Sequence, residues 1–176
     1  MRYALLFLAW FFTLTASGAT GDTSPAGYIL DSGDLVRIQV YGESDLTLET
    51  RLSDSGTISY PFLGQIRVAG MTLERLRETI TEGLSGDYLL NPRVNVTILE
   101  YRQFFINGEV RNPGGFPYQP GLTVRKAISI AGGFTERASR DEIFIIPDSR
   151  AGKQKQVDLN APVQPGDIIT IEQSFF

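Results

Sequence analysis

The feature that most constrains the fold is a Gly-Asp turn followed by an alternating apolar strand, which occurs twice. The stretch "DSGDLVRIQV" covers residues 31–40, and "QPGDIITIE" covers residues 164–172. Such turns favour glycine, which adopts positive φ, and aspartate, which hydrogen-bonds its own backbone. Alternating apolar residues indicate a strand with one buried face. The repeat predicts that Asp34 and Asp167 occupy equivalent turn-to-strand positions, which is a structural role.

Residues 28–101 have the pattern of one β-rich unit with a single helix. Up to residue 68, short apolar runs separated by Gly, Asp and Ser predict short strands joined by tight turns. The pattern changes at Met71, because the apolar residues within 73–84 recur at helical spacing behind Thr72, a good N-cap. Gly83 or Gly86 can end this helix. Alternation in "NPRVNVTILEY" then predicts a half-buried strand.

Residues 102–176 have the pattern of a second unit. "FFINGEVRNPGGFPY" predicts strand, turn and strand, and "LTVRKAISIAGG" predicts a short helix capped by Thr123. "DEIFIIP" and "QPGDIITIE" predict two more strands with a turn-rich segment between them. This order is consistent with a β-grasp arrangement. The predicted fold class is therefore α+β, with two small β-rich domains that each contain one main helix.

The N-terminus predicts export. Residues 1–19 combine Arg2, an apolar run and the small residues Ser17-Gly18-Ala19, which is typical of a secretory signal peptide cleaved after about Ala19. A retained N-terminal anchor is the alternative. Residues 20–27 are small and polar and predict a flexible leader. No other stretch approaches the ~20 apolar residues of a membrane-spanning helix, so we expect a soluble exported protein.

Two missing residue types limit the chemistry. The chain has no cysteine and no histidine, which excludes disulfides, thiolate nucleophiles, His-based triads and Cys/His zinc sites. A pI near 4.9 argues against nucleic-acid binding. Neither a phosphate-loop pattern nor a DxDxDG calcium loop occurs. We therefore expect no catalytic residue, no metal and no cofactor.

Several functional alternatives remain beside the structural interpretation. Asp-Ser-Gly begins at both Asp31 and Asp54, as in acid proteases, but 23 residues within one small unit are too few for two lobes. The spacing of acidic residues in the sequence does not exclude the carboxylate pair of a glycosidase, because such pairs are assembled in three dimensions. The Arg excess, 13 to 3 Lys, suits acidic sugars or a partner's carboxylates, although exposed solubilising charge is favoured. Aromatic residues suit sugar stacking, although core packing is favoured; they are Tyr41, Tyr60, Tyr101, Phe104, Phe105, Phe116 and Tyr118.

Taken in order, the motifs resemble the outer-membrane polysaccharide export (Wza-like) family. "YILDSGDLVRIQVYGESDL", "SDSGTISYPFLGQIRVAGMTLERLRETI" and "NPRVNVTILEY" resemble the polysaccharide-export domain, and "INGEVRNPGGFPYQPGLTVRKAISIAGGFTERASR" with "QPGDIITIEQSFF" resembles an SLBB β-grasp domain. The resemblance covers residues 28–176. It implies turn and packing roles for Gly33, Asp34, Gly56, Pro61, Gly64, Gly70, Pro92, Gly108, Val110, Pro113, Gly114, Ala131, Gly132, Gly133, Gly166 and Asp167.

The resemblance implies a non-enzymatic role in export of capsule or exopolysaccharide. Family members form rings that conduct the polymer across the periplasm. The sequence lacks a lipidated cysteine and ends after one SLBB unit, so we expect a short periplasmic member. We expect it to act with an outer-membrane export protein of the β-barrel kind and with an inner-membrane chain-length regulator or polymerase complex. The alternatives are a monomeric carbohydrate-binding adaptor and a periplasmic hydrolase. The sequence singles out no sugar-contacting residue.

Overall fold

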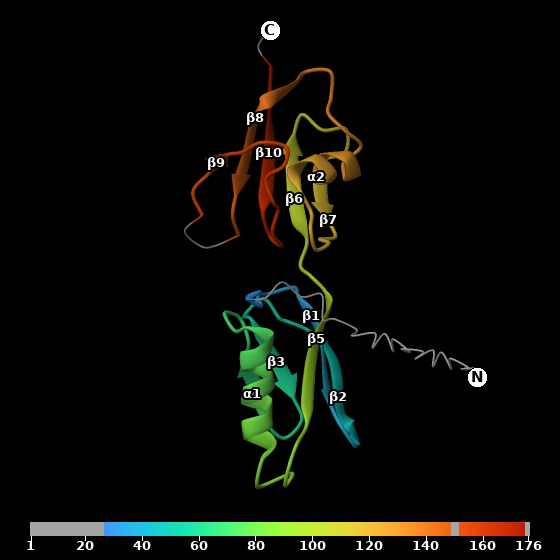
Figure 1. Cartoon of the computed structure of the whole chain (residues 1–176), viewed down its shortest axis with the longest axis vertical. Helices are drawn as coiled ribbons and strands as arrows, with labels where there is room; N and C mark the ends of the chain where they lie inside the picture. The colour runs from blue at the N-terminus through green and yellow to red at the C-terminus, as the bar shows by residue number, and fades with distance from the viewer. Residues whose placement is uncertain (1–26, 149–151, 175–176) are drawn as a thin grey trace, which may run out of the picture.

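The computed structural model describes residues 27–148 and 152–174, so the predicted signal peptide and nearly all of the predicted leader lie outside the described residues. Figure 1 shows two units, one above the other, joined by a short segment after β5 (Val94–Glu100). We name them the N-terminal unit (residues 28–101) and the C-terminal unit (residues 102–176), after the predicted boundary, which stays a prediction. Among the described residues, no helix has the length and apolar character needed to cross a membrane.

The N-terminal unit contains a three-stranded antiparallel sheet, a β-hairpin and one helix. Its elements are β1 (Leu35–Val40), β2 (Glu43–Arg51), β3 (Thr57–Tyr60), β4 (Gly64–Arg67), α1 (Leu73–Leu84) and β5. β1 is the central strand and pairs with β2 and β5, whereas β3 and β4 form the hairpin. The predicted alternation is confirmed in β1, where Val36, Ile38 and Val40 are buried.

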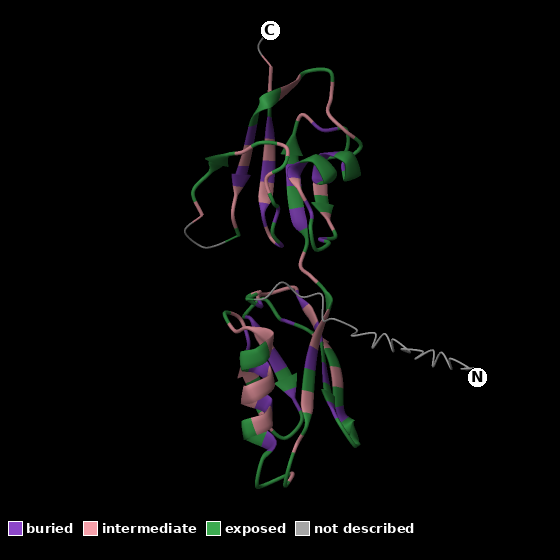
Figure 2. Ribbon diagram, viewed as in Figure 1, coloured by how far each residue is buried: buried purple, intermediate pink, exposed green. Residues whose placement is uncertain are grey.

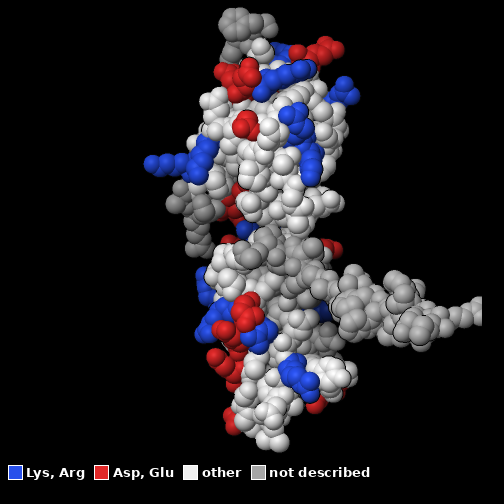
Figure 3. Space-filling model, viewed as in Figure 1, with Lys and Arg blue, Asp and Glu red and all other residues white. Residues whose placement is uncertain are grey.

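Helix α1 begins and ends as its sequence predicts. The Thr72 hydroxyl accepts a hydrogen bond from the backbone N–H of Arg75 at 3.1 Å, which satisfies one of the free N–H groups of the first turn. Leu76, Ile80 and Leu84 form its buried face. Full burial of each of these side chains stabilises the unit by about 1.5–3 kcal/mol. The opposite face carries ion pairs, and Figure 3 shows charges of both signs gathered over this helix.

Of the two glycines that were candidates for ending α1, only Gly86 lies beyond the helix. It has φ +89°, a conformation that glycine adopts without steric cost. Gly83 lies within α1, where an added Cβ would be 2.8 Å from Cδ1 of Leu63. Its missing side chain therefore lets the β3–β4 turn pack closely against the helix.

The C-terminal unit is a five-stranded mixed sheet with one helix. Its elements are β6 (Phe104–Gly108), β7 (Gly114–Phe116), α2 (Val124–Ile130), β8 (Ala138–Ile146), β9 (Lys155–Gln156) and β10 (Ile168–Gln173). The strand order is β7-β6-β10-β8-β9, with β10 parallel to β6 and antiparallel to β8. The first and last strands thus lie side by side at the centre, as in a β-grasp. This confirms the predicted α+β fold class.

Each unit has its own hydrophobic core, visible as two separate sets of buried residues in Figure 2. The N-terminal core includes Val36, Ile38, Leu76 and Ile80, all without exposed surface. The C-terminal core is built around the strand pair β6 and β10 and the inner face of α2. No buried residue belongs to both cores, although partly buried Tyr101 of the N-terminal unit packs against the C-terminal core.

Two strands differ from the sequence-based prediction. β2 is nine residues long, whereas the sequence predicted only short strands there, because its exposed residues hide the alternation. β9 has two residues and lies in the segment predicted as turns. It pairs with Phe144 and Ile145 of β8 at the sheet edge, and a strand this short leaves no periodic signal.

Candidate functional site

The two Gly-Asp turns have the same hydrogen-bond geometry. In the first, the Asp34 N–H donates to the Asp31 carbonyl at 3.2 Å, and the Asp31 N–H donates to Oδ2 of Asp34 at 2.9 Å. In the second, the Asp167 N–H donates to the Gln164 carbonyl at 3.2 Å, and the Gln164 N–H donates to Oδ2 of Asp167 at 2.8 Å. Both aspartates are buried. Each carboxylate therefore closes its own turn from within.

Both turns also hold the segment that links the two units. The Arg102 N–H donates to Oδ1 of Asp34 at 2.8 Å. On the other side, the Gly166 N–H donates to the Gln103 carbonyl at 3.0 Å, and the Phe105 N–H donates to the Asp167 carbonyl at 2.8 Å. One turn belongs to each unit, so the backbone of the link is hydrogen-bonded to both units.

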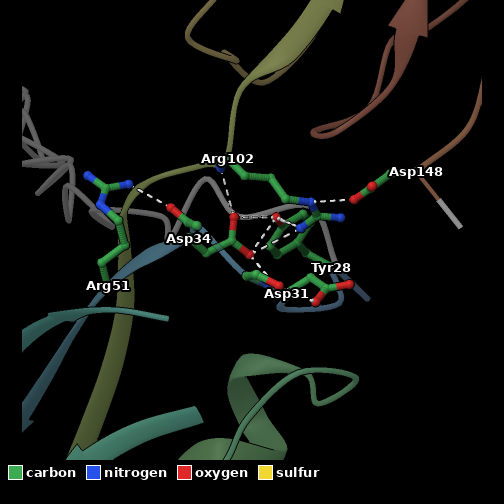
Figure 4. A network of polar contacts seen from close by, with 8 residues as sticks. Tyr28, Asp31, Asp34, Arg51, Arg102 and Asp148 are labelled. Atoms are coloured by element: carbon green, nitrogen blue, oxygen red, sulfur yellow. Dashed lines mark hydrogen bonds and ion pairs between the residues drawn. The ribbon is translucent and has the colours of Figure 1, made fainter. Parts of the chain in front are cut away.

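The Arg102 side chain joins the units directly, as Figure 4 shows. Its Nη1 lies 3.2 Å from Oδ2 of Asp34 in the N-terminal unit, and its Nε donates to Oδ2 of Asp148 in the C-terminal unit at 2.7 Å. Nη1 also donates to the Tyr28 hydroxyl at 2.6 Å, and this hydroxyl lies 2.8 Å from both carboxylate oxygens of Asp34. We call Tyr28, Asp34, Arg102 and Asp148 the joint cluster.

Burial affects the pKa values of the side chains at the joint. The Asp34 side chain has no exposed surface and that of Arg102 is 18 % exposed. Burial, reinforced by the Asp34 carboxylate, raises the pKa of Tyr28 well above its usual range, so its hydroxyl remains a donor. Burial alone would lower the pKa of Arg102, but Tyr28, Asp34 and Asp148 outweigh it, and the pKa of this guanidinium is raised. Burial likewise raises the pKa of Asp167.

A groove of about 880 Å³ opens beside the joint cluster, between the two units. The link between the units forms one side of it. Tyr101 and Tyr118 lie on this groove with their rings in an edge-to-face contact, 5.3 Å between centroids, and Tyr28 contacts Tyr101 in the same way at 5.0 Å. We call it the joint groove; its other lining residues include Asp31, Arg51, Glu100, Gln103, Phe105, Gln119 and Asp148.

Of the sixteen residues to which the family resemblance gives structural roles, four lie at the joint: Gly33, Asp34, Gly166 and Asp167. The other glycines of that set have positive φ away from it, in turns or at the ends of strands: Gly56, Gly64, Gly70, Gly108, Gly114, Gly132 and Gly133. Val110 and Ala131 are buried in the C-terminal core. Pro61, Pro92 and Pro113 lie outside helices and strands. Their roles stay predictions, because the set does not gather into one site.

The aromatic candidates separate by exposure. Tyr60, Phe104 and Tyr118 are buried, and Tyr101 and Phe116 are partly buried. Tyr41 is 75 % exposed at the far end of the N-terminal unit, and Phe105 is 43 % exposed in the joint groove. Only Phe105 thus combines an exposed ring with a concave site.

Sequence reasoning missed Tyr28, Arg102 and Asp148 as members of a site. The sequence explained Asp34 by its turn alone. Its second role, binding Arg102, has no signal in the sequence around the turn. Arg102 is 68 residues from Asp34 and 46 from Asp148, so no local pattern connects them. The one available signal was the position of Arg102 at the predicted boundary between the units.

Asp31 and Asp54, the aspartates of the two Asp-Ser-Gly sequences, lie in different turns and share no hydrogen bond among the described contacts. Asp54 is exposed in the turn before β3, whereas Oδ1 of Asp31 accepts the Ser32 N–H at 2.8 Å in the turn before β1. The described residues contain no group of three or more acidic side chains placed to hold a metal ion. What the joint groove offers is a mixture of aromatic surface, carboxylates, amides and guanidinium groups, which suits binding by hydrogen bonds and stacking.

Comparison with known proteins agrees with this two-unit architecture. Residues 22–99 match the family model described as polysaccharide biosynthesis/export protein, and residues 103–158 match the SLBB domain. The chain is 37 % identical over 92 residues to the exopolysaccharide production protein ExoF of Rhizobium meliloti, covering 51 % of this chain and 22 % of ExoF.

Two further relatives carry export or transport in their names. The EPS I polysaccharide export outer membrane protein EpsA of Ralstonia nicotianae is 26 % identical, over 83 % of this chain and 47 % of EpsA. The polysialic acid transport protein KpsD of Escherichia coli is 30 % identical, over 58 % of this chain and 18 % of KpsD. The chain thus spans less than half the length of these relatives. The chain thus combines a polysaccharide biosynthesis/export protein domain with a following SLBB domain.

Proposed function

We propose that the protein is a non-enzymatic, periplasmic component of a capsule or exopolysaccharide export system. Its copies assemble into a ring that serves as conduit or scaffold between inner-membrane machinery and an outer-membrane pore. The names of ExoF, EpsA and KpsD support the general role. The partners are an outer-membrane export protein and an inner-membrane chain-length regulator or polymerase complex.

The observation that carries the proposal is the joint cluster. A closed ring requires every subunit to present its contact surfaces at the same angle. Two units connected by a free linker would not do so. Here one partly buried guanidinium bonds to carboxylates of both units, which supports a chain with one fixed shape.

The joint groove favours a second candidate, a monomeric carbohydrate-binding adaptor. Its concave, partly aromatic surface would suit a sugar without any assembly. The two candidates differ in oligomeric state. Sedimentation velocity of the purified chain separates them, since a ring sediments as a discrete multiple of the 19.4 kDa chain and an adaptor as one copy.

A gene deletion tests the export role itself. The gene is deleted in its own organism without disturbing its neighbours, and surface or secreted polymer is quantified separately from polymer held in the envelope. We expect loss of polymer outside, retention within, and rescue by the intact gene. Normal secretion in a strain without a second copy of the family would contradict the proposal.

A further inference from the structure

The joint groove has the dimensions of a ligand site. Its volume of about 880 Å³ lies within the ~300–1,000 Å³ typical of small-molecule sites. Residues of both units line it, and the fixed link runs along it. A ligand seated there would contact both units at once without requiring either to move.

Phe105 gives the groove a flat apolar surface. The alternation of β6 buries Phe104 and Ile106, so Phe105 points away from the core and is 43 % exposed. Its cross-strand neighbour is Gly115, where an added Cβ would lie 3.0 Å from Cε1 of the Phe105 ring. One side of the ring thus rests over a glycine. The aromatic surface that remains exposed can stack against the C–H groups of a sugar ring, because these groups are apolar and match the negative face of the ring.

The groove also supplies unused hydrogen-bonding groups. The side-chain amides of Gln103 and Gln119 make no hydrogen bond within the described part of the chain, although both line the groove. Arg51 is held in place by bonds of 2.6 Å to the Gly33 carbonyl and to Glu100. Its side chain remains 51 % exposed. Amides that both donate and accept are suited to hydroxyl groups.

Charge decides which kind of sugar fits. Three carboxylates, from Asp31, Glu100 and Asp148, line the groove against two guanidinium groups. Both guanidinium groups already pair with carboxylates, Arg51 with Glu100 and Arg102 with Asp34 and Asp148. An anionic polymer would be repelled by the carboxylates and would find no unpaired guanidinium in the groove. An uncharged polymer would avoid this repulsion and could use the hydrogen-bond donors and acceptors of the groove.

From these observations we propose that the joint groove binds an uncharged segment of a polysaccharide, with one sugar ring stacked on Phe105 and hydroxyl groups bonded to Gln103 and Gln119. This inference rests on the proposed role in polysaccharide export and names the site and the substrate class. Contact with both units lets the chain hold the polymer without opening the joint cluster.

Binding is tested with the purified full chain and defined oligosaccharides. Saturation-transfer difference NMR is recorded with three neutral tetrasaccharides, cellotetraose, maltotetraose and β-1,4-galactotetraose, and with tetragalacturonate. We expect a signal from at least one neutral tetrasaccharide and at least fivefold weaker binding of tetragalacturonate. Absence of binding by all three neutral probes, or stronger binding of tetragalacturonate, would overturn the inference.

Variants assign the binding to the groove. Phe105→Leu keeps an apolar side chain over Gly115 but removes the aromatic face, and we expect about five- to tenfold weaker binding. Gln119→Ala should weaken binding about two- to fivefold. Tyr41→Ala is the matched control, because it removes a more exposed aromatic ring outside the groove. Thermal unfolding verifies that each variant is folded. Equal binding by Phe105→Leu and the parent chain would refute the site.

The same variants in the cell separate this inference from the proposed function. If deletion of the gene stops secretion but Phe105→Leu secretes normally and binds normally, the groove is not the saccharide site and the export role stands. If deletion leaves secretion unchanged, the export role is wrong even where the purified chain binds sugar. Reduced secretion by Phe105→Leu, together with normal secretion by Tyr41→Ala, supports both the saccharide site in the groove and the export role.

Discussion

At the scale of single residues, Asp34 does two jobs with one carboxylate. It closes its own turn through the Asp31 N–H, and it also accepts hydrogen bonds from the backbone and side chain of Arg102, the first residue of the C-terminal unit. A buried charge of this kind is expensive unless each of its lone pairs finds a donor. Tyr28 supplies the remaining donor. The folded state therefore depends on Arg102 more than its place in a linker suggests.

Arg102→Met should lower the free energy of unfolding by about 3–5 kcal/mol, because it leaves Asp34 buried without its cation. Urea denaturation measures the loss. Arg75→Met is the matched control, since it removes an arginine from the exposed pair with Glu78 on α1 and should cost less than about 1 kcal/mol. Similar losses in the two variants would show that the joint cluster contributes little to stability.

Tyr28 should make the fold sensitive to alkali. Its pKa is raised in the folded protein, whereas in the unfolded chain the phenol ionises near pH 10. Its contribution to stability is therefore complete below that pH and is lost as pH rises further, by up to about 1.4 kcal/mol per pH unit. Urea denaturation between pH 8 and 11.5 should show a shallower decline in Tyr28→Phe than in the parent chain. Tyr41→Phe should follow the parent; an identical decline in all three would exclude Tyr28 as the cause.

At the scale of elements, the parts predicted from sequence are those with a local signal. Helices α1 and α2 were predictable because Thr72 and Thr123 mark their starts and their apolar residues recur at helical spacing. Strands β1 and β5 were predictable because they alternate. The joint cluster was not, since its members approach one another only when both units are folded. Phe105 was considered as a sugar contact, but only the structure separates it from the buried Phe104.

The central strands of the C-terminal unit offer a test of close packing. At Gly108, the last residue of β6, an added Cβ would lie 2.0 Å from the Ile171 carbonyl oxygen of β10. At Gly133, also at positive φ, an added Cβ meets nothing within 4 Å. Gly133→Ala should therefore cost only the backbone strain of about 1–2 kcal/mol. Gly108→Ala should cost at least about 3 kcal/mol, because β6 and β10 must also separate.

Thermal unfolding of the two alanine variants measures the difference. Gly133→Val extends the same test, since a branched side chain at that φ should destabilise the unit further. Unchanged unfolding of Gly133→Val would refute the turn role predicted for this residue. Equal losses of stability at Gly108 and Gly133 would mean that backbone strain alone causes the loss, and that the close contact with β10 relaxes easily.

At the scale of the whole molecule, two separate cores are connected by the polar bonds of the joint cluster and by one chain of ring contacts, from Tyr28 through Tyr101 to Tyr118. Interfaces between domains of one chain usually permit relative motion unless they are large and hydrophobic. Here the Arg102 guanidinium, the bonds between the link and the two turns, and three tyrosine rings take the place of a large hydrophobic interface. The arrangement of the units therefore depends on a few identifiable bonds.

That dependence can be measured by distance, because the chain contains no cysteine. Glu82→Cys on α1 and Lys155→Cys on β9 place spin labels at exposed positions, one on each unit. Electron–electron dipolar spectroscopy should give one narrow distance distribution in this background. Asp148→Asn should broaden it, because the Arg102 Nε loses its charged partner in the C-terminal unit. Distributions of equal width would show that the ion pair between Arg102 and Asp148 is not needed to fix the arrangement.

The hydrogen bonds that attach the link to both units should also make it resistant to proteolysis. The connection between two domains is normally the stretch most readily cut, because a protease needs an extended backbone with free hydrogen-bonding groups. In this chain the Arg102 N–H, the Gln103 carbonyl and the Phe105 N–H are all bonded to the Gly-Asp turns. A protease would have to pull the segment out of both turns before cleaving it. Resistance of this short segment to digestion is thus a direct consequence of a turn that occurs once in each unit.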